Sequence, residues 1–252
     1  MIGKILGIKT LGVSSIAILL AISFFLSRIL GIWRDRLLAG TFGAGSDLDI
    51  YFAAFRIPDF IYAVFIAGGL TAVFLPIFSE YFRKDEKEAW RITSSLFYLV
   101  SLGMLILSVV LMVAMPFLIR FITPGFSLEM RQELLPLANL MLLSPIILGI
   151  SGVLSGVIQY FNRFFAYALA PIMYNLGIIG GIVFLEPSFG LKGVVWGVII
   201  GTVLHTGIQL YPALRSGFRL HSALHFKHPA IVQALRLMAP RTLGAAAYNL
   251  NI

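Results

Sequence analysis

Apolar runs of about 20 residues recur along this chain, and short polar segments separate them. A helix needs a run of about that length to cross roughly 30 Å of hydrocarbon. One run, SLGMLILSVVLMVAMPFLI over residues 101–119, does not alternate between apolar and polar positions, whereas the strands of a membrane barrel alternate over about 10 residues. The pattern therefore predicts an all-α polytopic membrane protein.

The runs predict six membrane spans and the beginning of a seventh. The expected spans lie near residues 11–33, 50–78, 92–119, 134–158, 164–185 and 191–213, and a further helix starts near 230. Residues 1–215 would then hold the six spans. Residues 216–229 would form an amphipathic cytoplasmic linker, and the seventh span would start within residues 230–252 and be cut off by the chain end.

Proline and small residues inside the runs predict helix distortions and close helix contacts. Pro58 follows Arg56 by two residues and lacks a backbone donor, so the second helix should kink or unwind near its charge. The segments GISGVLSGVIQ (149–159) and GIIGGI (177–182) offer small-residue faces on which helices can approach closely. We expect a tightly packed bundle.

Composition excludes several classes of protein. Hydrophobic residues make up 59% and charged residues 12% of the chain, against about 25% charged residues in soluble domains. There is no cysteine, which excludes disulfides, thiol nucleophiles and cysteine-ligated metals. We interpret the net charge of +8 as a set of orientation signals in loops, and we expect no nucleic-acid partner.

Lysine and arginine divide unequally between the two sides of the membrane. The side of the N-terminus carries Lys4, Lys9, Arg83, Lys84, Lys87, Arg91, Arg163, Arg215, Arg219 and Lys227. The other side carries Arg34, Arg36, Arg120, Arg131 and Lys192. Because cytoplasmic loops carry the excess of positive charge, the N-terminus is expected in the cytoplasm.

Charges gather in residues 27–60, between apolar runs. Arg28 and Asp35 are seven residues apart, close to two helical turns, so they share one stripe of a helix. Asp49 and Arg56 repeat that spacing on the second span, and Asp59 follows one turn later. Such charges either pin two helices together as buried salt bridges or line a wet cavity.

The number of arginines favours the cavity. Three arginines exceed what one salt bridge needs, and guanidinium groups bind phosphate with two parallel hydrogen bonds. The predicted substrate-binding residues are Arg28, Arg34 and Arg56, and the predicted supporting counter-charges are Asp35, Asp49 and Asp59. We predict no catalytic residues and no metal site, because neither a Ser/His/Asp arrangement nor an HExxH motif occurs.

Other polar residues in the sequence have ordinary explanations. His221, His225 and His228 fit one face of an interfacial helix better than a metal site. His205 is either a proton carrier or, as is more common, a packing residue that forms hydrogen bonds. We expect Asn175 and Gln159 to help pack helices together.

Several long motifs, taken together, resemble the MurJ (MviN) family of lipid II flippases. They are SRILGIWRD, FGAGSDLDIYFAAFRIPDF, SPIILGISGVLSGVIQYFNRFFAYALAPIMYNLGII, GVVWGVIIGTVLHTGIQLYPALRSGFR and RLMAPRTLG, in that order. This family belongs to the superfamily of multidrug, oligosaccharidyl-lipid and polysaccharide exporters. The likeness covers nearly the whole chain.

The resemblance implies a fold and an activity. Similar proteins have fourteen helices in two lobes around a cationic cavity, so this chain would be the first six-helix lobe plus the start of helix 7, a fragment of a longer protein. By alternating access they move lipid II, the undecaprenyl-pyrophosphate-linked peptidoglycan precursor. The family's motif residues correspond to Arg28, Arg34, Asp35, Asp49 and Arg56 here.

Two positions depart from the family pattern. Tyr62 stands where a cavity arginine is expected, and Ala67 stands in place of a glutamate. These departures leave open a relative that carries another polyprenyl-linked glycan. A non-transporting scaffold of the cell-wall machinery is a further alternative, in which the charges serve only to pair helices. A drug antiporter is disfavoured because cation exporters need acidic cavities.

The expected partners are the lipid-linked peptidoglycan precursor, membrane lipids and the rest of the second lobe, in the bacterial cytoplasmic membrane. We expect a multi-pass transporter and not an enzyme. No cofactor is identifiable, although coupling to an ion or to the membrane potential is compatible with a charged cavity.

Overall fold

The computed structural model describes residues 12–221 and 225–250, apart from the side chains of residues 67–69, 71–72 and 248–250. Within these residues the chain forms helices and no strand. The helical elements are α2 (Val13–Phe42), α3 (Ser46–Ile61), η1 (Tyr62–Leu70), α4 (Thr71–Lys84), α5 (Glu86–Ile122), α6 (Leu128–Met141), α7 (Leu143–Tyr160), α8 (Phe164–Gly180), η2 (Gly181–Leu185), α9 (Glu186–Phe189), α10 (Leu191–Arg215) and α11 (Pro229–Leu250). The predicted all-α fold is confirmed.

Five helical segments in the described residues are long and apolar enough to cross a membrane. They are Val13–Phe42, Glu86–Ile122, Leu128–Tyr160, Phe164–Phe189 and Leu191–Arg215. The second expected span corresponds to α3, η1 and α4, which follow one another without a break. The first helix extends to Phe42, beyond the expected end at 33. As a result, Arg34 and Asp35 lie within helix α2.

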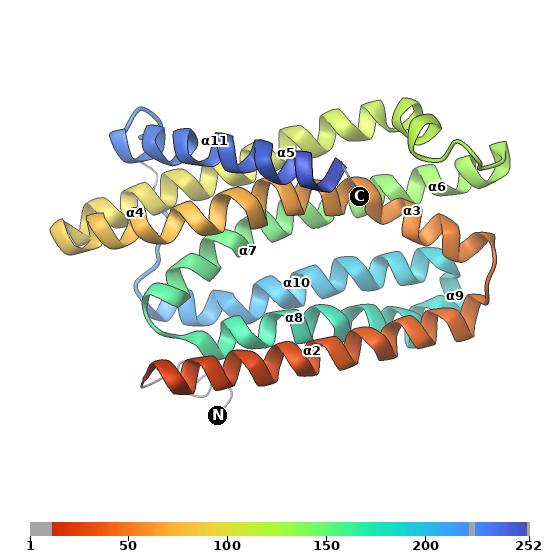
Figure 1. Cartoon of the computed structure of the whole chain (residues 1–252), viewed down its shortest axis with the longest axis horizontal. Coiled ribbons are helices and arrows are strands. Elements are labelled where there is room, and N and C mark those ends of the chain that lie inside the picture. The colour runs from red at the N-terminus through yellow and green to blue at the C-terminus, as the bar shows by residue number, and fades with distance from the viewer. Residues whose placement is uncertain (1–11, 222–224, 251–252) are drawn as a thin grey trace.

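The helices form two packed groups (Figure 1). In one group, α2 packs against α8, and α8 packs against α10. In the other group, α3, α4, α5, α6 and α7 pack with α11, and α7 joins the groups through α10. Helices α2 and α3 follow each other in sequence but make few contacts. The first two spans therefore diverge from their shared turn.

Glycines set the close approach of α8 and α10. A Cβ atom at Gly177 would lie 2.2 Å from the Cα atom of Gly201, and one at Gly181 would lie 2.5 Å from the Cα atom of Gly197. Real Cβ atoms do not approach backbone so closely, so only glycine permits this contact. The prediction that the GIIGGI segment supports close helix packing is confirmed.

The second span changes its winding after Pro58. This proline is buried within α3, and four residues later the chain adopts the wider π-helical winding of η1, from Tyr62 to Leu70. A proline removes one backbone hydrogen bond, and single π segments are frequent at functional sites. The expected distortion near Arg56 is confirmed.

The linker before α11 differs from the expected interfacial helix. Its described residues, 216–221 and 225–228, are not helical. Instead, the backbone N–H groups of His221 and His225 donate to the hydroxyls of Ser94 and Ser95 on α5, each at 3.1 Å. The linker N–H groups thus bond to buried serine hydroxyls and not to the carbonyls four residues earlier, as a helix would require. The histidines therefore do not share a helical face.

One hydrogen bond fastens the start of α11 to α5. His228 Nε2 lies 2.9 Å from Glu88 Oε1. The other ring nitrogen of His228 accepts the backbone N–H of Ala230 at 3.1 Å, close to the first residue of α11. This histidine therefore caps a helix and is not part of a metal site.

Candidate functional site

Arg34 lies inside helix α2, about 12 Å along the axis from the last residue, Phe42. Its Nε and one terminal nitrogen donate to Asp35 Oδ1 at 2.9 and 2.8 Å. Its other terminal nitrogen donates to Asn175 Oδ1 at 3.2 Å. A guanidinium carries five N–H groups, so two remain available to a ligand. The side chain is 25% exposed.

Asn175 positions this guanidinium from the neighbouring helix α8. It is buried, and its amide nitrogen donates to Ser27 Oγ and to the carbonyl of Pro171, both at 3.1 Å. With its nitrogen engaged in these bonds, the amide presents its oxygen to Arg34. Asn175 therefore joins α2 to α8 and orients the cation.

Helices α3 and α8 add further polar groups around Arg34. Its charge interacts electrostatically with Asp59 and Tyr51 of α3 and with Tyr174 of α8. We call this group the Arg34 cluster; it comprises Arg34, Asp35, Tyr51, Asp59, Tyr174 and Asn175. Three helices that are distant in sequence thus converge on one cation.

Arg56 has a different environment. Its guanidinium donates to the carbonyl of Ile122 at 2.8 Å, at the end of α5. Arg56 and Asp49 line a cavity of about 570 Å³ together with Thr123 and Phe126. The expectation that Asp49 and Arg56 share a helix face is confirmed, because both line this cavity.

Two expected neighbours are not found. Asp35 shares a helical stripe with Arg28, but its carboxylate accepts from the adjacent Arg34. Asp59 interacts with Arg34, whereas its expected neighbour Arg56 bonds to Ile122. Adjacent residues on a helix do not face each other. The long side chain of Arg34 nevertheless bends back to the carboxylate of Asp35.

Arg28 is exposed on α2 and forms no hydrogen bond or ion pair with any residue in the described part of the chain. The structure thus brings Arg34, Asp35 and Asp59 together. It places Arg56 with Asp49 elsewhere.

A second polar cluster contains His205, which the sequence analysis named as a packing residue that forms hydrogen bonds, without identifying its partners. Ser151 and Ser155 of α7 form hydrogen bonds with His205 and Gln209 of α10, at 3.0 and 2.5 Å respectively. Both pairs are spaced i, i+4, so each lies on one helical face. This matched spacing was the available signal. We call these four residues the Gln209 network; beside it lies a cavity of about 230 Å³ that Tyr62 and Tyr167 also line.

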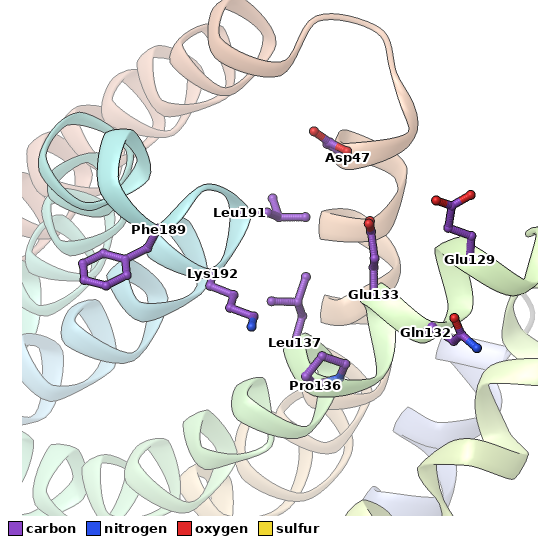
Figure 2. A pocket seen from close by; sticks show the side chains of 9 residues that line it. All are labelled: Asp47, Glu129, Gln132, Glu133, Pro136, Leu137, Phe189, Leu191 and Lys192. Carbon is purple, nitrogen blue, oxygen red and sulfur yellow. The ribbon is translucent and has the colours of Figure 1, made fainter.

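A third polar region lies where α3, α6 and α10 begin. Figure 2 shows carboxylates of Asp47, Glu129 and Glu133 and the ammonium group of Lys192 around a cavity of about 670 Å³. Within the described residues, no group of three or more His, Cys, Asp or Glu side chains is arranged to hold a metal ion. Lys192 balances part of the negative charge at this cavity.

Comparison with known proteins gives a consistent result. The family model described as lipid II flippase MurJ matches residues 38–252. The probable lipid II flippase MurJ of Buchnera aphidicola subsp. Acyrthosiphon pisum is 30% identical over 232 residues, which is 90% of this chain and 45% of that protein. The lipid II flippase MurJ of Burkholderia cenocepacia is 28% identical over 246 residues, which is 93% of this chain and 48% of that protein.

A solved structure is also similar. The lipid II flippase MurJ in an inward closed conformation aligns with a TM-score of 0.76 at 29% sequence identity. The alignment covers 90% of this chain and 47% of that one. The chain therefore spans about half the length of the relatives it matches.

Proposed function

The chain belongs to the lipid II flippase MurJ family, and we propose that it forms the first lobe of a transporter that flips lipid II by alternating access. The names of the family and of its members describe flippases. We accordingly propose a transporter and not an enzyme. The chain itself is a multi-pass protein of the bacterial cytoplasmic membrane. Its proposed partners are lipid II, the surrounding lipids and the remainder of the second lobe.

The Arg34 cluster is the observation that carries this proposal. An arginine inside a membrane span costs at least about 2.5 kcal/mol on insertion scales, so it is retained where it meets a partner or a wet cavity. Asp35 and Asn175 occupy three of the five N–H groups of Arg34. The remaining two suit a pyrophosphate oxygen, because arginine binds phosphate through paired hydrogen bonds.

The neighbouring carboxylates limit how tightly Arg34 holds a substrate. Asp35 balances Arg34 when no substrate is bound, and Asp59 adds a second negative charge nearby. A pyrophosphate that approaches Arg34 competes with these carboxylates for the same cation. The substrate is thereby held strongly enough to enter the cavity and weakly enough to leave it on the other side.

Arg28 and Arg56 extend the cationic path in this proposal. Arg28 lies about 9 Å along α2 from Arg34, toward the start of the helix. Arg56 lies near the opposite end, against the last residues of α5. The membrane potential acts on such charges with about 2.3 kcal/mol per unit charge per 100 mV, which is a sufficient energy source for coupling.

Tyr62 favours a second candidate substrate. It stands where the family pattern has an arginine, and it lines a cavity without charged side chains. A polyprenyl-linked glycan other than lipid II would need fewer cations at that position. This alternative keeps the role of Arg34, because any polyprenyl pyrophosphate carries the same anion.

Complementation tests the proposal. The full-length gene is expressed in cells depleted of their own lipid II flippase, and an Arg34→Ala variant is compared at equal membrane abundance. We expect rescue by the parent and loss of rescue by Arg34→Ala. The matched control is Arg236→Ala, because Arg236 is also on a helix but exposed outside the Arg34 cluster. It should rescue fully.

The outcomes separate the candidates. Failure of an inserted parent to rescue would exclude lipid II as the substrate and leave the other glycan. Rescue by Arg34→Ala equal to that of the parent would exclude pyrophosphate binding at this cluster and favour a scaffold.

A further inference from the structure

A small cavity lies where α2, η1, α7, α8 and α10 meet. Its volume of about 230 Å³ corresponds to roughly seven water molecules at ~30 Å³ each. Whole ligand sites usually measure about 300–1,000 Å³, so this cavity accommodates one part of a larger ligand. Its walls carry hydroxyls and an imidazole among apolar side chains, and no charged residue lines it.

The hydrogen bonds of the Gln209 network run in one direction. The Ser155 hydroxyl donates to Gln209 Oε1 at 2.5 Å. The Gln209 amide nitrogen then donates to Ser151 Oγ at 2.8 Å. Ser151 still has its own hydroxyl proton to donate, and His205 Nδ1 lies 3.0 Å from its oxygen. Gln209 is fully buried, and Ser151 and Ser155 are 1% and 6% exposed.

This network fits one tautomer of His205. With Nδ1 as the acceptor of the Ser151 hydroxyl proton, the neutral ring carries its own proton on Nε2. Among the described residues, no group accepts that Nε2–H in a hydrogen bond. His205 lines the cavity, so in this tautomer its Nε2–H is a donor toward any molecule that enters. The cavity therefore suits a ligand that carries a hydrogen-bond acceptor.

Tyr62 connects the cavity to the Arg34 cluster. It is 37% exposed at the cavity wall. It interacts electrostatically with Asp59 and Tyr174 of the cluster on one side and with Tyr167 of the cavity on the other. One ligand can therefore contact both places if it carries an anion next to an uncharged polar group.

We propose that this cavity is a subsite for the uncharged glycan headgroup of the lipid-linked substrate, with His205 Nε2–H donating to a sugar hydroxyl or amide oxygen. The inference rests on the proposed function and deepens it. The Arg34 cluster takes the pyrophosphate. The cavity disfavours that anion because it offers no counter-charge in an apolar surrounding. Its polar side chains bind the sugar instead.

Two lipids distinguish the subsite from the pyrophosphate site. Binding of lipid II and of undecaprenyl pyrophosphate, which lacks the glycan, is measured on the purified full-length protein. The variants are His205→Asn, which keeps a group near Nδ1 and removes the Nε2 donor, and His205→Gln, which keeps an amide donor near Nε2. Thermal stability of each variant is recorded alongside.

We expect His205→Asn to weaken lipid II binding about tenfold and to leave undecaprenyl pyrophosphate binding unchanged. His205→Gln should restore most of the lipid II affinity. Tyr62→Phe, which removes one hydroxyl at the rim, is the second variant if His205→Asn is unstable. It should also weaken lipid II selectively, by about threefold.

The results overturn the inference in distinct ways. If the parent binds both lipids and neither His205→Asn nor Tyr62→Phe alters the difference between them, the cavity is no glycan subsite. Equal losses for both lipids assign His205 a purely structural role. If the parent binds neither lipid, the proposed function itself is wrong and the subsite is lost with it.

Discussion

The Arg34 cluster and the Gln209 network place polar groups inside the same helical bundle in opposite ways. The Arg34 cluster contains three charged residues, of which Arg34 and Asp35 are partly exposed, and among the described residues the guanidinium leaves two N–H groups unused. In the Gln209 network the groups are neutral, nearly all buried, and bonded to one another. The first arrangement remains open to an anion, and the second is closed except at one imidazole nitrogen.

The contrast follows from the energetics of burial. A charge taken out of water requires a partner or solvent, and Arg34 has both, because Asp35 and Asn175 bond to it and its side chain is 25% exposed. Neutral amides and hydroxyls satisfy each other completely, so they can be packed between α7 and α10 without solvent. We therefore expect substitutions in the Gln209 network to change stability and substitutions in the Arg34 cluster to change substrate binding.

The largest expected effect on stability is that of Gln209→Leu. This change removes three hydrogen bonds of the Gln209 side chain, to Ser155, Ser151 and the carbonyl of His205. Two of these bonds join α10 to α7 at about 0.6 kcal/mol each, and the buried Ser155 hydroxyl loses its acceptor at a cost of about 1 kcal/mol more, so the total loss is about 2 kcal/mol. A thermal unfolding assay of the full-length protein in detergent measures it.

The matched control for Gln209→Leu is Gln159→Leu. Gln159 donates only to the backbone of Ser155 one turn earlier, so its loss should cost less than half as much. Equal stability of Gln209→Leu and the parent would contradict the closed network.

The next largest effect is expected at the Arg34 cluster, where a second carboxylate would compete with the substrate for the guanidinium. Asn175→Asp puts a second carboxylate oxygen 3.2 Å from the guanidinium, where the amide oxygen lies now. The ion pair should strengthen, and affinity for undecaprenyl pyrophosphate should fall about tenfold, because the new charge competes with the phosphate. Equilibrium binding to the full-length protein measures the change.

Asn175→Leu serves as the comparison for Asn175→Asp. It removes the amide without adding charge, so it should reduce stability more than Asn175→Asp does and affect affinity less. Unchanged affinity in Asn175→Asp would mean that the pyrophosphate does not meet Arg34.

The smallest effect is expected when the counter-charge of Arg34 is removed. Asp35→Asn removes the counter-charge of Arg34 and keeps an oxygen in its place. Affinity for undecaprenyl pyrophosphate should rise about threefold at low salt and lose that gain at high salt, as expected for a screened interaction. A salt titration of binding is the measurement. A decrease in affinity would assign Asp35 an orienting role only.

The sequence predicted the helices because each span carries its own signal in hydropathy, and Pro58 carried the signal for the distortion that η1 shows. It did not predict which helix each span faces. The spacing of Arg28 and Asp35 defines a stripe on α2, but the neighbour of that helix is α8 and not α3. Helix pairing depends on glycine contacts between α8 and α10 that are distant in sequence.

The candidate site was predicted in part for the same reason. Arg34, Asp35 and Asp59 were named from charge in an apolar setting; Arg34 pairs directly with Asp35 and interacts electrostatically with Asp59. The Gln209 network was missed because serine, glutamine and histidine are ordinary packing residues when considered one at a time. Their matched i, i+4 spacing acquires meaning only when α7 is known to face α10.

The glycine contact between α8 and α10 has a consequence for genetics. A Cβ at Gly177 or Gly181 would meet backbone at 2.2 or 2.5 Å, so no other amino acid fits without separating the helices. In a saturating mutational screen of this gene, these two codons would appear as intolerant as Arg34. Their intolerance would report the distance between two backbones and not a contact with cargo.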